Sequence, residues 1–123
     1  MQKDVQRRKG FTLIEVLIVV AILAILISIA IPKFKAYREN AQKQACLADL
    51  RTALSSCVAY LAENSSATVS DCNSNASGVI TSTKNVSGIT FSNDTSGNIS
   101  ATGTCTPLNV SCTVSSNGTA SCQ

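Results

Sequence analysis

Residues 11–31 read FTLIEVLIVVAILAILISIAI, and this stretch decides the fold. Eighteen of its 21 side chains are apolar, and the three polar ones are Thr12, Glu15 and Ser28. A helix of this length rises about 31 Å, which matches the hydrocarbon core of a membrane. It is also longer than the apolar region of a signal peptide. We therefore expect a membrane-spanning helix that remains in the mature protein.

The charges outside this stretch are unevenly placed. The first ten residues carry Lys3, Arg7, Arg8 and Lys9 against Asp4, which accounts for the whole formal charge of +3 of the chain. From Phe11 onward, six basic side chains balance six acidic ones. A basic leader before an apolar segment indicates targeting, and no basic stripe with interleaved aromatic residues follows. We expect no nucleic acid as the main partner.

The chain has six cysteines, all beyond the apolar stretch: Cys46, Cys57, Cys72, Cys105, Cys112 and Cys122. An even number in a small polar region is typical of disulfides formed in an oxidising compartment. A zinc site is the competing interpretation, but the close Cys pairs of zinc modules and all histidines are missing from the sequence. We expect disulfides, no metal and no cofactor. The cysteines also place the C-terminal side outside the cytoplasm.

Glu15 is the unusual residue of the span. A carboxylate deep in a membrane costs about 2.5–3.5 kcal/mol on insertion scales, so it should have a partner there. The alternative is that Glu15 lies near the helix end and reaches the headgroups. Sequence physics leaves both interpretations open.

Residues 9–15 read KGFTLIE and are followed by VLIVVAIL over 16–23, which resembles the processing site of type IV pilins. Pro32, Lys33 and Phe34 also match the pattern of that family. The resemblance implies that residues 1–10 are a leader, cut after Gly10 by a prepilin peptidase. It further implies N-methylation of Phe11, and pairing of Glu15 with the N-terminal amine of a neighbouring subunit.

By this resemblance, the function is that of a structural subunit in a type IV pilus, a homo-oligomeric filament serving adhesion, twitching motility or DNA uptake. The expected partners are the prepilin peptidase, the pilus assembly machinery and the inner membrane, which holds the precursor before an extracellular filament forms. One alternative is a pseudopilin of a type II secretion or competence machine. A simple membrane-anchored ectodomain is another, but it leaves Glu15 and the Gly10–Phe11 junction unexplained. Without a nucleophile–base constellation, enzyme activity is not expected.

The span, residues 11–32, is expected to continue into a second helical segment over 33–63. Pro32 lacks a backbone donor and predicts a kink at their junction. A helical face spaced by 4, 4, 3 and 4 residues then predicts packing against a domain. Its members are Cys46, Leu50, Leu54, Cys57 and Leu61.

Residues 64–123 form the distal domain, with 24 Ser or Thr, eight Asn and three charged side chains. Alternation over 108–114 predicts a strand, and residues 79–83, 86–91 and 99–105 are weaker candidates. The predicted fold class is α+β, in which a long N-terminal helix packs on a small antiparallel sheet stapled by disulfides.

Helix geometry limits the disulfides, because Cys46 and Cys57 lie about 16 Å apart on one helix and cannot pair with each other. Sequence proximity favours Cys57–Cys72. The alternation around Cys112 favours Cys46–Cys112, which leaves Cys105–Cys122. The main rival joins Cys112 to Cys122 and Cys46 to Cys105, and closes a C-terminal loop like that of many pilins.

Seven of the eight distal asparagines begin an Asn-x-Ser/Thr triplet, the pattern of N-glycosylation acceptors. Strands with alternating polar residues produce the same pattern without any glycosylation. We favour the second interpretation.

Overall fold

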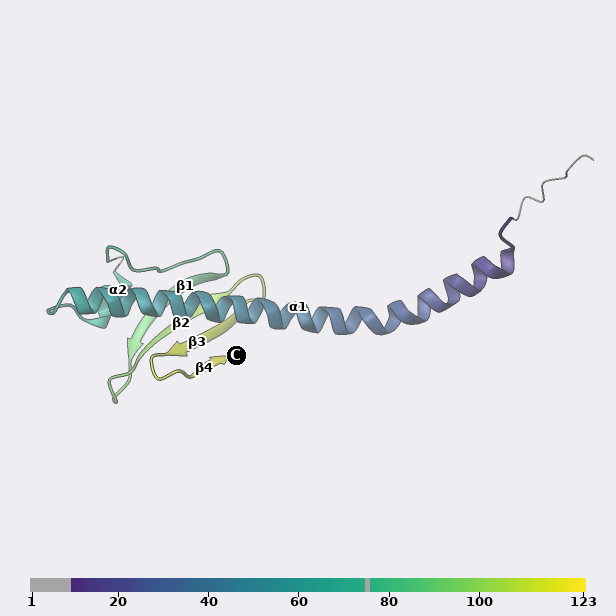
Figure 1. Cartoon of the computed structure of the whole chain (residues 1–123). Helices are drawn as coiled ribbons and strands as arrows, with labels where there is room; N and C mark the ends of the chain where they lie inside the picture. Colours follow the sequence, from purple (N-terminus) through teal and green to yellow (C-terminus); the bar gives the residue numbers. More distant parts are fainter. Residues whose placement is uncertain (1–9, 75) are drawn as a thin grey trace, which may run out of the picture. The chain divides into compact units, whose positions relative to one another are not determined.

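The structure is a computed structural model, and it describes residues 10–74 and 76–123. The chain divides into two compact units, residues 1–37 and 38–123, each described by itself below. The predicted leader lies outside the described residues except for Gly10, as does Asn75. A single element, α1 (Leu13–Glu63), crosses the unit boundary (Figure 1).

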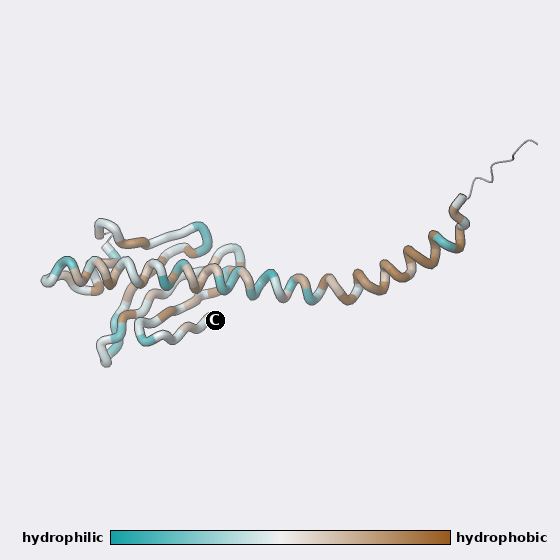
Figure 2. The backbone as a smooth tube through the Cα atoms, in the orientation of Figure 1, coloured by the Kyte–Doolittle hydropathy of each residue, from teal (hydrophilic) through white to brown (hydrophobic). Residues whose placement is uncertain are grey.

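The first unit is the apolar part of α1, coloured brown in Figure 2. Its large side chains are exposed along its whole length, and none of the most apolar 18-residue window is buried. Within the described residues, α1 is the one helix long and apolar enough to cross a membrane. Pro32 lies inside α1, so helix is present on both sides of it. The kink predicted at Pro32 stays a prediction.

In the second unit, α1 presents the predicted face to the domain. Its buried residues are Cys46, Leu50, Ala53, Leu54 and Cys57. Leu61 is only partly buried at the end of this face, and the helix ends two residues later. The neighbouring Val58 is 43% exposed, and it lines an open groove of about 530 Å³ beside the turn that follows residue 115.

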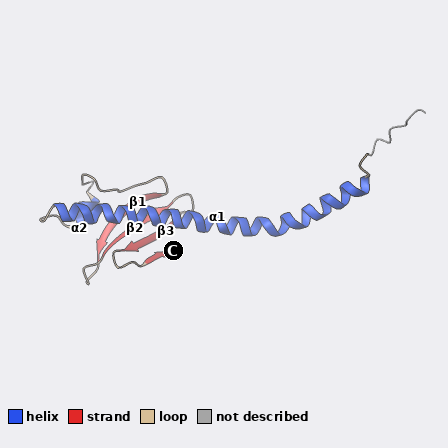
Figure 3. Cartoon of the chain, viewed as in Figure 1, coloured by secondary structure: helices blue, strands red, loops and turns tan. Residues whose placement is uncertain are grey.

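Four antiparallel strands follow in the order β1 (Val86–Asn93), β2 (Ile99–Cys105), β3 (Val110–Ser115) and β4 (Ala120–Cys122) (Figure 3). The predicted α+β fold class, a long apolar helix with a small disulfide-stapled antiparallel sheet, is therefore confirmed. Residues 79–83, one of the weaker strand candidates, do not form a strand. Their segment is held partly by side chains, since Ile80 N donates to Ser56 Oγ of α1 at 3.0 Å.

A short helix, α2 (Val69–Asn73), lies between α1 and the sheet in sequence. The Asp71 carboxylate caps it by accepting from Thr68 N at 2.6 Å and from Thr68 Oγ1 at 2.9 Å. These backbone and side-chain hydrogen bonds hold the pKa of Asp71 below its ordinary value. At the other end of α2, Asn73 donates to Phe91 O and accepts from Phe91 N, as a paired strand residue would. Asn73 is the distal asparagine that begins no Asn-x-Ser/Thr triplet.

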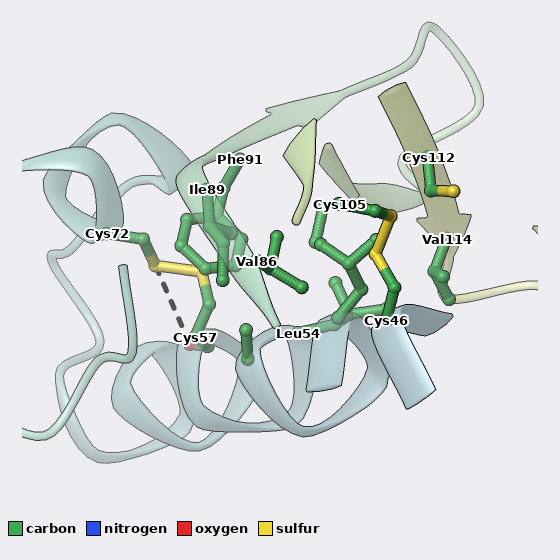
Figure 4. Packing of buried hydrophobic residues seen from close by; sticks show 13 residues of the cluster. Cys46, Leu54, Cys57, Cys72, Val86, Ile89, Phe91, Cys105, Cys112 and Val114 are labelled. Carbon is green, nitrogen blue, oxygen red and sulfur yellow. Dashed lines mark hydrogen bonds between the residues drawn. A yellow bond between two sulfur atoms is a disulfide. The ribbon is translucent and has the colours of Figure 1, made fainter. Parts of the chain in front are cut away.

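The core between α1 and the sheet is small and lies between two disulfides. Figure 4 shows Cys57–Cys72 on one side and Cys46–Cys105 on the other, with Val86 between them. A further polar tie holds the loop before β1, since Asp49 Oδ2 accepts from Thr83 Oγ1 at 2.7 Å and Asn85 Nδ2 at 3.0 Å. With few large apolar side chains available, such covalent and polar links carry much of the stability.

Two of the three predicted disulfide pairings differ from the structure. Cys57–Cys72 is present, but the structure has Cys46–Cys105 and Cys112–Cys122 in place of Cys46–Cys112 and Cys105–Cys122. The reason is strand register, because Cys112 stands directly opposite Cys122 in the β3–β4 pair. Ser111 and Gln123 exchange backbone hydrogen bonds next to it, so Cys112 and Cys122 occupy the close, non-hydrogen-bonded position.

Candidate functional site

The amino end of α1 holds a reciprocal pair of hydrogen bonds between Thr12 and Glu15. Thr12 N donates to Glu15 Oε2 at 3.2 Å, and Glu15 N donates to Thr12 Oγ1 at 3.4 Å. Thr12 immediately precedes the first helical residue, Leu13, so this is a capping box that satisfies two helix-end donors. The cue Thr-x-x-Glu stands in the sequence at 12–15, but treating Glu15 as an isolated charge missed it.

This local cap gives the Glu15 carboxylate a hydrogen-bond partner within its own chain. The carboxylate accepts a backbone hydrogen bond in the first turn, where the helix dipole also favours negative charge. Only one of the two carboxylate oxygens takes part in these bonds, so the other can accept from an external donor. Glu15 can therefore cap its own helix and meet a cation from outside the chain.

The Gly10–Phe11 junction lies immediately before this cap. Phe11 is 91% exposed, and no described atom beyond the adjacent residues lies within 4 Å of the position that a Cβ on Gly10 would occupy. The peptide bond between them is thus open to a large partner. Phe11, Glu15, Val16, Val19 and Val20 line an open groove of about 480 Å³.

The sequence-predicted residues thus fall at the two ends of the span. Gly10 and Phe11 come just before α1, Glu15 lies in its first turn, and Pro32 directly follows the apolar stretch at the other end. Between Glu15 and Pro32 the helix presents large apolar side chains on every side, each about half or more exposed. Such a helix needs an apolar environment supplied by a membrane or by other chains.

The second unit presents a different surface. The outward positions of β1, β2 and β3, and Ser121 of β4, carry only Ser and Thr besides Gly88, and cross-strand register aligns them in rows. Two pairs bond directly, Ser92 with Ser100 at 3.0 Å and Thr102 with Thr113 at 2.9 Å between hydroxyl oxygens. The outward face of the sheet is therefore polar and carries no charged side chain at these positions.

The domain also contains a cluster of sulfur atoms. The Sγ atoms of Cys46, Cys105 and Cys112 all lie within 4.8 Å of one another and are buried. Each of them is in a disulfide, so none is a thiolate that could bind a metal. The cluster is therefore structural.

Comparison with known proteins points to the amino end of α1. Residues 5–31 match the family model described as the prokaryotic N-terminal methylation motif. The chain is 46% identical over 54 residues to the type IV major fimbrial protein FimA of Dichelobacter nodosus, across 42% of this chain and 35% of that protein. It is 40% identical over 45 residues to the type II secretion system core protein G of Klebsiella pneumoniae, across 37% of this chain and 32% of that protein.

These matches are partial in length, since the aligned stretches span about a third of the relatives. No solved structure matches this chain significantly. The motif covers residues 5–10 of the leader, the Gly10–Phe11 junction, the capping box and the apolar stretch of α1 up to Ile31. The chain therefore carries the N-terminal methylation signal of type IV prepilins and is homologous to a type IV fimbrial protein.

Proposed function

We propose that this chain is the precursor of a type IV pilus subunit, which assembles into a homo-oligomeric filament through its apolar helix. The observation that carries the proposal is the order of features at the amino end: an open Gly10–Phe11 junction, a capped Glu15 and an unpartnered apolar helix. Each feature matches one step of assembly, namely processing, docking and packing in the filament core.

Processing comes first. A prepilin peptidase cuts after Gly10, and Phe11 becomes the N-methylated first residue. A glycine at this position suits the cut, because its missing side chain leaves the backbone unshielded. Cleavage also removes the basic leader, which holds all of the net charge of the precursor.

Docking follows. The new Phe11 amine is a cation, and the free oxygen of Glu15 on a neighbouring subunit is its acceptor. A buried amine and a carboxylate are costly alone and tolerable as a pair, so the contact fixes the axial register of one subunit on the next. The capping box keeps the Glu15 carboxylate bonded within its own chain until that amine arrives.

The second candidate is a pseudopilin of a type II secretion or competence machine, favoured by the match to the secretion protein. Both share the processing signal and differ in the length and location of the filament. The neutral hydroxyl surface favours a filament that is exposed outside the cell. The three disulfides fit either location, because the periplasm is oxidising as well.

The test is to shear filaments from the surface of the producing cells and to determine the N-terminal residue and intact mass of their subunit. The expected subunit begins at N-methylated Phe11. Abundant sheared filaments support the pilus, whereas processed protein without surface filaments supports the pseudopilin. Met1 at the mature N-terminus would support a simple membrane-anchored ectodomain and overturn both.

A further inference from the structure

The turn of α1 that follows the apolar stretch combines two aromatic and two basic side chains. Lys33, Phe34, Lys35 and Tyr37, which we call the collar, come directly after Ile31 and Pro32. Phe34 is 70% exposed and Tyr37 is 72% exposed, although both are large aromatic side chains. Exposed rings of this size indicate a surface that a partner covers.

The collar residues lie around much of the helix. At about 100° per residue, Phe34 and Tyr37 point about 60° apart. Lys33 lies about 40° from Tyr37, whereas Lys35 lies about 100° beyond Phe34 and is nearly opposite Lys33. From residue 16 to residue 38 there is no acidic side chain. Lys33 has no acidic residue three or four positions away in the helix, whereas Lys35 has one, Glu39.

We propose that the collar binds the anionic phospholipid headgroups at the membrane face where the span ends, and that it sets the depth of the precursor. Aromatic rings such as that of Tyr prefer the headgroup level, where one end is apolar and the other wet. Lysine stems extend along apolar surface while the ammonium groups reach phosphate. The direct continuity of the collar with the span places all four side chains at that level.

The depth has a consequence for Glu15. Phe34 lies nineteen positions after Glu15, a rise of about 28 Å in a helix, which is close to a hydrocarbon thickness of about 30 Å. With the collar at one interface, the Glu15 carboxylate lies at the other. It is then hydrated as well as capped by Thr12, and the precursor avoids burying a charge in the membrane centre. This step rests on the membrane-anchored stage of the proposed function.

The chain contains no tryptophan, so a substituted one reports its own position alone. Phe34→Trp and Tyr37→Trp in the full chain give two independent probes, which covers the failure of either variant to fold. Each is reconstituted into phosphatidylcholine vesicles with and without phosphatidylglycerol. Lipids brominated at different depths then measure the level of the indole ring.

We expect the strongest quenching from bromines nearest the headgroup and a blue shift of the emission on binding to phosphatidylcholine vesicles. A second blue shift should follow when phosphatidylglycerol is present. Lys33→Gln with Lys35→Gln should abolish that second shift, whereas the control Lys84→Gln, on an exposed loop of the globular unit, should leave it unchanged. Inorganic phosphate without phosphatidylglycerol should not reproduce it, because the proposed ligand is the lipid surface.

Three outcomes would overturn the proposal that the collar binds headgroups. They are unquenched emission typical of water, strongest quenching from bromines at the ends of the lipid acyl chains, and an equal blue shift with free phosphate. The vesicle measurement needs no filament. A failed collar together with normal surface filaments therefore leaves the proposed function standing. Conversely, headgroup-level quenching in a chain that forms no filaments would support the collar and contradict the proposed filament function.

Discussion

Two stretches of the same helix differ in how their apolar side chains are buried. Between Cys46 and Cys57, α1 buries one face against its own chain and is fixed there by a disulfide at each end. Between Val16 and Ile31, it carries apolar side chains on every side and buries none of its most hydrophobic window. The first stretch is completed by folding, whereas the second requires a membrane or other subunits. Mutations in the two stretches should therefore separate assembly from stability.

The largest expected effect is on assembly, from Glu15→Ala. Losing one partner of a buried ion pair costs about 3–5 kcal/mol, which predicts a loss of filament yield of more than tenfold. Membrane insertion should persist or improve, because a charged side chain is removed from the end of the span. Sheared filament and membrane-bound precursor are measured by quantitative immunoblotting. Glu39→Ala, at an exposed position of the same helix, is the matched control, and normal yield from Glu15→Ala would refute the pairing.

Replacing both Cys46 and Cys105 by Ala should have the largest effect on the globular unit. This bridge spans 59 residues, and the chain-entropy estimate for such a loop is about 4 kcal/mol. Replacing Cys112 and Cys122, separated by 10 residues, should cost about 3 kcal/mol. Denaturant unfolding of the detergent-solubilised chain measures both. A larger loss of unfolding free energy from removing Cys112–Cys122 would show that loop length does not determine how much these disulfides stabilise the domain.

The sequence predicted the features that depend on local spacing. The apolar stretch over 11–31, the buried face through Leu50 and Leu54, and the alternation around Val114 all appear in the structure. The same holds for Cys57–Cys72, where a short separation limits the choice. In each case the deciding pattern lies within one element or between neighbours in the chain.

The features that were missed depend on which strands become neighbours. Cys112 is buried as its alternation indicates, but its partner was set by β4, a three-residue strand with almost no sequence signal. Asn73 pairs with Phe91 across 18 positions, which no local pattern encodes. The cap at Glu15 is local, and Thr-x-x-Glu encodes it, but from the sequence a place near the helix end was only an alternative for Glu15, and the hydrogen bonds with Thr12 were not predicted.

A smaller effect is expected from Gly103→Ala in β2. A Cβ there would collide with the Val86 side chain and press on Ile89 and Leu50 at 3.3 Å, so overpacking should cost about 1–3 kcal/mol. The exposed Thr104→Ala next to it is the control, and its effect should stay within about 0.5 kcal/mol. Urea midpoints of the two variants test the difference. Filament yield at low temperature should hardly change, because the span is untouched.

The smallest effect concerns pH and Asp71. The hydrogen bonds from Thr68 N and Oγ1 lower the pKa of Asp71 in the folded chain, so its contribution to stability is present above the ordinary carboxyl pKa. That contribution disappears as the pH falls through the lowered folded value. The urea midpoint of Asp71→Asn should therefore lie below that of the unmodified chain near neutral pH and converge with it in acid. Ser70→Ala, an uncharged change in the same helix, should shift the midpoint equally at every pH. If the difference in urea midpoint between Asp71→Asn and the unmodified chain were also the same at every pH, the cap would not depend on the charge of the carboxylate.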